Sequence, residues 1–225
     1  MAFDEIKRKV GFAAAELVND GMTVGLGTGS TAFFFIERLI EKTKQGLKIR
    51  AVASSRRSEE QARQGGIVIA DINSLSSLDI TVDGADEIDS AKRLIKGGGG
   101  ALVREKIVAA MSQEMVVVVD ESKLSSKLGN KKLPVEVIPF GIEATRCKIE
   151  KLGLGGVWRK NPDTTFYVTD NGNYIFDIFF KTPLDNPEEV HAHLIAIPGV
   201  VDTGFFFGLA GRTVIGFSDG QVVIE

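Results

Sequence analysis

The sequence has few of the residues that perform thiol chemistry. Its 225 residues contain 1 cysteine, Cys147, and 2 histidines, His191 and His193. A single cysteine excludes an internal disulfide and is typical of a reducing compartment. A cysteine nucleophile needs a base such as histidine beside it, and both histidines lie far along the chain from Cys147. We therefore expect no thiol catalysis.

Long apolar runs and an excess of basic residues are also absent. No stretch reaches the ~18 apolar residues of a membrane span, and the N-terminal residues mix acids with bases instead of forming the apolar core of a signal peptide. The net charge of -3 argues against the basic surface that binds nucleic acids or anionic membranes. With 44% hydrophobic and 25% charged residues, the composition is that of an ordinary globular protein. We expect a cytoplasmic protein that binds neither nucleic acid nor membranes.

In the first half of the chain, segments with strand and helix patterns alternate. The apolar spacing predicts helices over 3–18, 32–43, 58–64 and 102–111, and strands over 22–26, 49–53, 67–70, 79–82 and 115–119. These strands are almost continuously apolar, which is typical of a parallel sheet covered by helices on both faces.

The pattern changes after Lys123. The polar, basic segment 125–132 suggests a linker, and the following residues predict strands over 135–138, 166–168 and 174–178 with helices over 142–151 and 187–195. Residues 169–173 predict a tight hairpin turn in which Asn171 and Gly172 supply positive φ angles. This half indicates an antiparallel α+β unit, after which 213–217 and 221–224 predict a closing hairpin.

The first unusual loop is Gly25-Leu26-Gly27-Thr28-Gly29-Ser30-Thr31. Glycine N–H groups, hydroxyls and the helix N-terminus that follows can together bind a phosphate. The loop is no Walker motif, because no lysine follows its last glycine. Gly27-x-Gly29-x-x-Ala32 fits a loose dinucleotide pattern, and Arg56-Arg57 would suit a 2′-phosphate, so NADP stays open. The simpler alternative is a tight turn capped by Ser30 or Thr31.

The second loop, 81–89, is rich in acids: Asp83, Asp86, Glu87 and Asp89. Such carboxylates repel one another unless they are spaced apart or have partners. Their spacing does not fit a calcium-binding EF-hand, whereas a magnesium site stays open. The alternative is a solvated acidic turn.

The third segment places Lys96 before the run Gly97–Gly100 and Glu105 after it, near the start of the next expected helix. Successive glycines lose much conformational entropy on folding, so the run suggests a backbone that must pass close to something. Taken alone, Lys96 could be a surface charge and Glu105 an acid stabilised by the helix dipole. Because ligands bind beyond the carboxyl ends of parallel strands, the three loops together predict a binding site.

These segments resemble the signature segments of the ribose-5-phosphate isomerase A family. The resemblance rests on Gly27–Thr31, Val82–Glu87, Ile95–Gly99, Arg104–Lys106, Leu133–Pro139 and Val168–Asn173, and continues in order to Ile197–Val201. It covers nearly the whole chain. One region departs from the family pattern: the family often carries Gly-Gly-Arg-Pro and a Tyr-Arg pair before the hairpin, and residues 153–159 and 161–163 differ here.

The resemblance implies a Rossmann-like parallel-sheet catalytic domain, residues 1–128 plus 206–225, with an inserted α+β, ferredoxin-like lid, residues 129–205. It implies interconversion of ribose 5-phosphate and ribulose 5-phosphate without metal or cofactor, in a homodimer or homotetramer. Glu105 is implied as the base, with Asp83, Asp86 and Lys96 lining the site. The implied substrate contacts are Thr28, Gly29, Ser30 and Thr31; Asp83, Gly84, Ala85 and Asp86; Lys96, Gly97, Gly98 and Gly99; Lys123; and Lys7.

This reaction moves a proton between adjacent carbons through an enediol or enediolate, which needs a base near the proton and donors aimed at the oxyanion. Lys96 and the glycine N–H groups are the donor candidates, and either Asp83 or Asp86 assists ring opening. Two other functions stay open. A sugar-phosphate sensor would normally carry a DNA-binding helix pair, for which no segment is spare. An NADP-dependent oxidoreductase would normally have Tyr-x-x-x-Lys, and neither Tyr167 nor Tyr174 has a lysine four residues on.

Overall fold

The computed structural model describes residues 3–225, with side chains from Asp4 onward. The chain divides into two compact units. The first holds the chain up to Ala85, together with Arg104–Leu124 and Leu209–Glu225, and the second holds Asp86–Val103 and Ser125–Gly208. The junctions at Leu124–Ser125 and Gly208–Leu209 fall near the boundaries 128 and 205 expected from the sequence, while residues 86–103 accompany the second unit.

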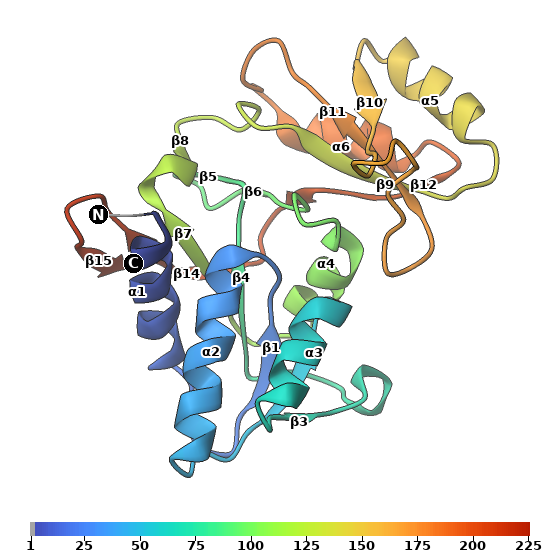
Figure 1. The fold of residues 1–225 in the computed structure, drawn as a ribbon. Helices are drawn as coiled ribbons and strands as arrows, with labels where there is room; N and C mark the ends of the chain where they lie inside the picture. Colours follow the sequence, from blue (N-terminus) through green and yellow to red (C-terminus); the bar gives the residue numbers. More distant parts are fainter. Residues whose placement is uncertain (1–2) are drawn as a thin grey trace. The chain divides into compact units, whose positions relative to one another are not determined.

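The first unit is built on a seven-stranded sheet of order β15-β14-β7-β4-β1-β2-β3 (Figure 1). Every neighbouring pair is parallel except β14 with β15. The strands are β1 Thr23–Leu26, β2 Arg50–Ala53, β3 Val68–Ile69, β4 Ile80–Gly84, β7 Met115–Asp120, β14 Ala210–Gly216 and β15 Val222–Ile224. The predicted parallel sheet and the predicted C-terminal hairpin are thus confirmed.

Helices cover the two faces of this sheet. They are α1 Phe3–Ala15, α2 Ser30–Lys44, α3 Arg56–Gln64 and α4 Leu102–Ala110, with short 3-10 turns η1 Ile72–Ser74 and η2 Glu121–Lys123. On one face, Val24 and Val82 lie in an apolar core with Phe35 of α2 and Val10 of α1. On the other, Val108 of α4 packs near Val52 and Leu78. All six residues of β7 are buried, as a central parallel strand requires.

The second unit has a four-stranded antiparallel sheet of order β10-β11-β9-β12. Its strands are β9 Leu133–Val137, β10 Gly156–Trp158, β11 Tyr174–Ile178 and β12 Val200–Thr203, and its helices are α5 Ile142–Lys151 and α6 Pro187–Ile195. Val135 and Phe176 share an apolar core with Ile149 and Leu194 of the helices. This unit therefore confirms the predicted α+β character.

Short strands complete the second unit. They are β5 Glu87–Asp89, β6 Leu94–Ile95 and β13 Phe205–Phe206, with β8 Leu124–Ser125 at a junction between the units. β6 pairs antiparallel with both β5 and β13. Strands of two or three residues carry too little periodicity to be recognised in a sequence.

The predicted strand 166–168 is wrong. β10 already occupies the edge of β11, and Arg159 N–H extends that pairing by donating to Ile175 O (2.8 Å). Phe166 forms only an isolated bridge with Lys160. The following turn forms as expected, with Gly172 N–H donating to Thr169 O (2.9 Å). Its positive φ comes from Gly172 alone (81°), not from Asn171.

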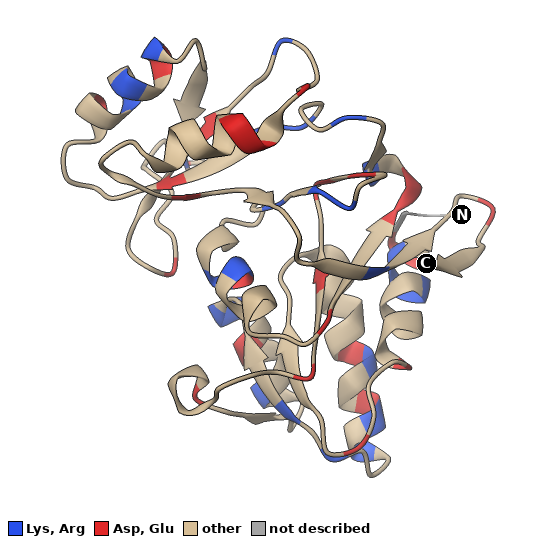
Figure 2. Cartoon of the chain, turned by 180° about the vertical axis from the view of Figure 1, so that it is seen from behind, with Lys and Arg blue, Asp and Glu red and all other residues tan. Residues whose placement is uncertain are grey.

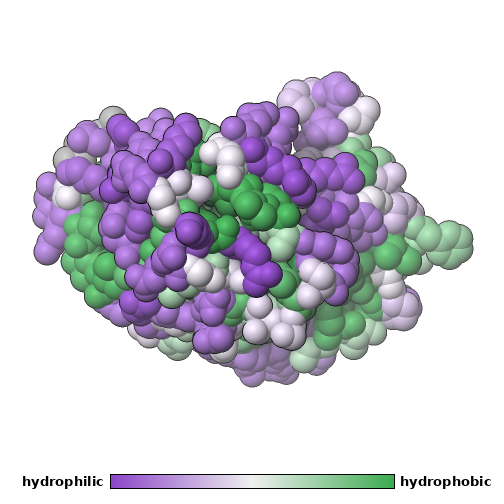
Figure 3. Space-filling model, turned by 90° about the horizontal axis from the view of Figure 1, so that it is seen from below, coloured by the Kyte–Doolittle hydropathy of each residue, from purple (hydrophilic) through white to green (hydrophobic). Residues whose placement is uncertain are grey.

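The surface carries mixed charge and scattered apolar residues. Lys and Arg are interspersed with Asp and Glu along the helices (Figure 2), and Arg38 of α2 pairs with Glu16 (3.1 Å) and Glu41 (2.8 Å). Apolar residues form separate patches between hydrophilic ones on the face drawn in Figure 3. Within residues 3–225, none of the helices has the length and apolar character needed to cross a membrane.

Candidate active site

The strand order of the first unit reverses between β1 and β4. β1 pairs with β2 on one side and with β4 on the other, so the loops that follow β1 and β4 diverge at the carboxyl edge of the sheet. In open parallel sheets this switch point is where ligands bind. At this point lie the loop Gly27–Gly29 and the last residues of β4, Asp83 and Gly84.

A serine directly after β2 and a serine of α3 hold the Gly27–Thr31 loop in place. Thr28 Oγ1 lies 2.8 Å from Ser54 Oγ, and Ser58 Oγ donates to Gly27 O at 2.7 Å. Ser54 Oγ also donates to Leu26 O (3.1 Å). Sequence inspection missed Ser54 and Ser58, although serines directly after the strand next to β1 were the available signal.

The hydroxyls at the start of α2 are not used as helix caps. The N-cap residue is Gly29, with φ 110°, and no side chain caps the helix. Within residues 3–225 neither Ser30 nor Thr31 donates or accepts a side-chain hydrogen bond, and Ser30 is exposed. The alternative in which these residues merely cap the turn is therefore wrong. An uncapped helix N-terminus with hydroxyl-bearing residues in its first turn is a common place for an anion to bind.

Asp83 is part of the same loop system. Its Oδ1 accepts hydrogen bonds from the N–H groups of Thr28 (2.9 Å) and Gly84 (2.8 Å), and the residue is 1% exposed. A Cβ at position 27 would overlap the Asp83 carboxylate and backbone. Gly27 is therefore needed to let the two strand ends approach, and Asp83 is fixed by backbone donors.

Glu105 lies on the side of the sheet toward which the Asp83 side chain points. Thr81 Oγ1 contacts Val108 O (3.4 Å) and Ser112 Oγ (2.5 Å), so Thr81 points at α4. Side chains alternate along a strand, so Asp83 points to that face as well, about 6.6 Å nearer the carboxyl edge. Glu105 precedes Val108 by three residues, so it lies on the same helix face and about 4.5 Å nearer the carboxyl edge of the sheet. Asp83 and Glu105, which is 3% exposed, are thus brought together.

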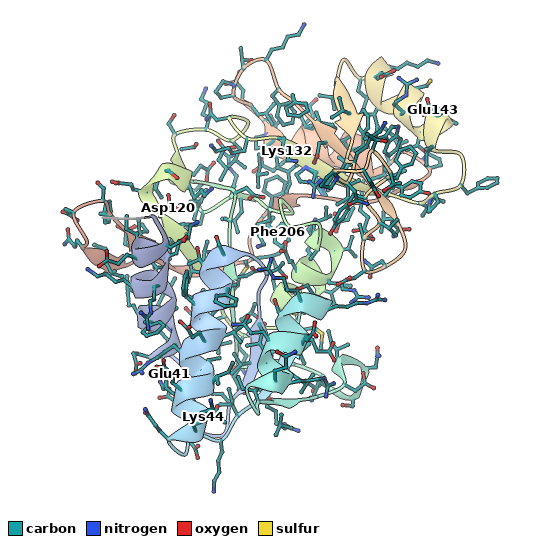
Figure 4. The ribbon with its side chains drawn as sticks, in the orientation of Figure 1. Glu41, Lys44, Asp120, Lys132, Glu143 and Phe206 are labelled. Carbon is teal, nitrogen blue, oxygen red and sulfur yellow. The ribbon has the colours of Figure 1, made fainter. Side chains whose placement is uncertain are left out.

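Two lysines of the first unit belong to the same sheet edge. Lys123 ends η2, directly after β7, and Asp120 (labelled in Figure 4) caps this turn by accepting from Ser122 N–H at 3.0 Å. Lys7 lies on α1 beside Ile6, which packs near Gly216, the residue level with the end of β7. Lys7 Nζ lies 3.8 Å from Asp4.

The second unit holds the remaining predicted residues. Asp86 Oδ2 accepts from Gly98 N–H (2.7 Å), and a Cβ at position 98 would lie 2.6 Å from Oδ1 of the same carboxylate. Lys96 is 2% exposed, with its Nζ 5.4 Å from the ring centroid of Phe206 (labelled in Figure 4). The backbone of the glycine run therefore passes close to the Asp86 carboxylate. The glycines themselves suggested such a close approach.

Each remaining acid of the acid-rich loop has its own donors. Asp89 forms an ion pair with Arg93 (2.7 Å) and accepts from Ala91 N–H (3.0 Å). Glu87, which is fully buried, accepts from the N–H groups of Gly129 (3.0 Å) and Lys131 (3.1 Å). The solvated-turn alternative is wrong for Glu87, and segment 125–132 is anchored to it. Among residues 3–225, no three His, Cys, Asp or Glu side chains converge as a metal ion requires.

Comparison with known proteins decides the family. The model of the family described as ribose 5-phosphate isomerase A (phosphoriboisomerase A) matches residues 50–220. The chain belongs to the ribose 5-phosphate isomerase A family. It is 50% identical to ribose-5-phosphate isomerase A of Protochlamydia amoebophila over 97% of this chain and 94% of that protein, and 45% identical to the Bacillus mycoides protein over 96% and 97%.

Solved structures of ribose 5-phosphate isomerases have the same fold. The structure from Plasmodium falciparum matches with a TM-score of 0.94 and 39% identity, covering 99% of this chain and 98% of that one. A D-ribose-5-phosphate isomerase in complex with phospho-erythronic acid matches with a TM-score of 0.95 and 35% identity, covering 100% and 99%. The predicted Rossmann-like α/β fold is thereby confirmed.

Proposed function

We propose that this chain interconverts D-ribose 5-phosphate and D-ribulose 5-phosphate through an enediol or enediolate. Family membership supports the reaction class. The observation that carries the proposal is the pair of buried carboxylates, Asp83 and Glu105, on one face at the switch point beside the Thr28–Thr31 loop. A base next to a phosphate loop is the arrangement that proton transfer on a sugar phosphate needs.

We assign the proton transfer to Glu105. Its carboxylate is long enough to take a proton from one carbon and return it to the next, and burial keeps competing water away from it. Lys96 and N–H groups of the glycine run would stabilise the oxyanion that develops on the carbonyl oxygen; of these, Gly98 N–H already donates to Asp86 (2.7 Å). These donors act on charge that appears only during the reaction, so they lower the barrier more than they tighten substrate binding.

Ring opening falls to Asp83 or Asp86. Two residues, Gly84 and Ala85, separate them, so the chain itself keeps their Cα atoms within about 11 Å of each other. Both could therefore reach one pentose. Asp83→Asn and Asp86→Asn separate the roles, because the variant that has lost ring opening should be slow in the aldose-to-ketose direction while still exchanging the carbon-bound protons of ribulose 5-phosphate, which is open-chain.

We assign phosphate binding to Thr28, Gly29, Ser30 and Thr31, with Lys123 and Lys7 adding positive charge. The support is the uncapped N-terminus of α2 and the two hydroxyls that form no hydrogen bonds within residues 3–225. Gly84 and Ala85 would line the sugar on the other side of this loop.

The remaining features are also proposals. Residues 129–205 would act as a lid on a catalytic domain of residues 1–128 and 206–225, and the protein would work in the cytoplasm as a homodimer or homotetramer without metal or cofactor. Light scattering coupled to size-exclusion chromatography measures the subunit number directly.

The deciding experiment is to supply ribose 5-phosphate to the purified chain and to measure the rate at which the ketose, ribulose 5-phosphate, forms. 4-Phosphoerythronate, which carries a carboxylate in place of the enediolate, should inhibit it competitively. An absence of ketose from folded protein would refute the proposal. A rise in NADPH fluorescence on mixing would instead favour the oxidoreductase alternative, and tight pentose phosphate binding without turnover would favour a sensor.

A further inference from the structure

The carbonyl groups of the glycine run are held by side chains from distant parts of the second unit. Arg159 NH1 donates to Gly97 O (3.0 Å) and Gly98 O (3.1 Å), and Tyr167 Oη donates to Gly99 O (3.2 Å). Three successive carbonyls are thus bonded to two side chains that lie more than fifty positions further along the chain. We call Arg159 and Tyr167 the carbonyl clamp.

Arg159 is itself fixed in position. Its Nε and NH2 donate to the two oxygens of Asp177 (3.0 and 2.5 Å), which gives a bidentate pair, and its side chain is 10% exposed. Its Cζ lies 5.7 Å from the centroid of the Tyr167 ring, and Tyr167 N–H donates to Arg159 O (3.0 Å). A planar guanidinium can make all these bonds at once because its donors point in several fixed directions. A lysine ammonium could replace only part of them.

Holding a carbonyl also fixes the N–H group of the same peptide. The chain has no cis peptide among its described residues, and in a trans peptide the C=O and the next N–H point in opposite directions. The bond to Gly97 O therefore directs Gly98 N–H, which donates to Asp86 (2.7 Å). The bond to Gly98 O directs Gly99 N–H. This group donates no hydrogen bond within residues 3–225, and Gly99 is exposed, so its N–H can reach a ligand.

The run would not hold this geometry alone. Glycine loses more backbone freedom on ordering than any other residue, and the only internal bond of the run is Gly100 N–H to Gly97 O (2.9 Å). An exposed peptide with one free donor can rotate away from a ligand. Donors that lower a barrier must instead be oriented before the charge develops.

We propose that Arg159 and Tyr167 are positioning residues for the isomerisation. By holding the carbonyls of Gly97–Gly99, they aim the Gly99 N–H at the oxygen that becomes negatively charged. They also keep the Gly98 N–H hydrogen-bonded to the Asp86 carboxylate. This inference rests on the proposed function. It assigns a catalytic consequence to the segment that departs from the family pattern, where Arg159 ends the differing stretch 153–159.

The test compares Arg159→Lys with Lys132→Met. Lys132, labelled in Figure 4, also pairs with Asp177 (2.7 Å) but forms no hydrogen bond with the glycine run within residues 3–225, so it controls for the loss of an ion pair to the same carboxylate. Arg159→Lys should lower kcat about tenfold or more while changing KM for ribose 5-phosphate less than threefold. Lys132→Met should leave both values unchanged.

A second readout separates orientation from stability. Arg159→Lys should weaken binding of 4-phosphoerythronate by about the factor that it removes from kcat/KM, while binding of inorganic phosphate stays unchanged. A purely structural role predicts a lower melting temperature with normal kcat and normal inhibitor affinity in the folded protein, and that result would overturn the proposal.

Tyr167→Phe provides the independent variant. It keeps the ring beside Arg159 and removes only the hydroxyl that bonds Gly99 O, so kcat should fall severalfold without a large change in KM. If Arg159→Lys does not fold, an unchanged kcat in Tyr167→Phe refutes the clamp. If the wild-type chain itself makes no ribulose 5-phosphate, the proposed function fails instead, so the two failures are distinguishable.

Discussion

Replacement of Glu105 by glutamine is the strongest test of the proposed mechanism. Glutamine has nearly the same size and retains a hydrogen-bonding oxygen, but it cannot accept a proton. General base catalysis contributes roughly 10²–10⁴-fold in rate, which corresponds to about 2.7–5.5 kcal/mol of barrier. We expect kcat of Glu105→Gln to fall at least a hundredfold with little change in KM, because the proton acceptor acts in the transition state.

The stability effect of this change should be small. Glu105 lies in the first turn of α4, where a negative charge contributes about 0.3–1 kcal/mol through the helix dipole. For a chain of this size 1 kcal/mol shifts the melting temperature by about 2–4 °C. Melting temperatures within a few degrees of the wild type would therefore show that lost activity is not lost folding.

Glu59→Gln is the matched control. Glu59 lies in the first turn of α3 and pairs with Arg63 at 2.9 Å, so the same substitution there removes a helix-start charge from a residue that has no assigned role in the reaction. Its kcat should stay normal. Exchange of the substrate C2 proton with solvent deuterium should disappear in Glu105→Gln and persist in Glu59→Gln. Near-normal turnover by folded Glu105→Gln would refute the assignment and direct the search for the base to Asp83 or Asp86.

Three further results are expected. The double variant Ser30→Ala, Thr31→Ala should raise KM for ribose 5-phosphate in steady-state assays, and free ribose should be a very poor substrate; equal turnover of ribose and its phosphate would contradict the phosphate assignment. Dialysis against a chelator should leave the rate unchanged, and a loss restored by magnesium would revive the metal alternative. Glu87→Gln should destabilise the protein by about 1–3 kcal/mol at pH 7, measured by denaturant unfolding. Burial raises the pKa of Glu87, but hydrogen bonds from Ser125 and the Gly129 N–H outweigh it and lower that pKa from 4.5. Its stabilisation is therefore full above pH 4.5 and lost as the pH falls through the lowered pKa. The gap between variant and wild type should close in strong acid, and a gap that persists at low pH would contradict this assignment.

The sequence predicted what its local patterns encode. Strand patterns alternating with helix patterns, and the unbroken apolar strand 115–119, indicated a parallel sheet, and that sheet fixes where Gly27 and Asp83 must lie. The long helices were also predictable, within a few residues at their ends. The strand 166–168 was wrong because an edge of β11 can accept only one partner, and which segment pairs there depends on the whole unit.

The residues that hold the site were not predictable in the same way. Ser54 and Ser58 matter because β2 lies beside β1, and Arg159 matters because its loop reaches Gly97 and Gly98, residues 62 and 61 positions away. Neither spacing appears as a local pattern. Reactive groups are recognisable by residue type, whereas their supports are defined only by tertiary contacts.

The acid-rich loop shows how such supports permit the chemistry. An anionic substrate approaching several carboxylates would meet repulsion if those charges pointed outward. Instead, backbone N–H groups of Thr28 and Gly84 hold Asp83, that of Gly98 holds Asp86, and Glu87 turns to the segment 129–131. Each of these bonds orients the oxygen that accepts it. Asp83, one of the two acids proposed for ring opening, can therefore lie beside the proposed phosphate loop, because the Thr28 N–H of that loop fixes its carboxylate.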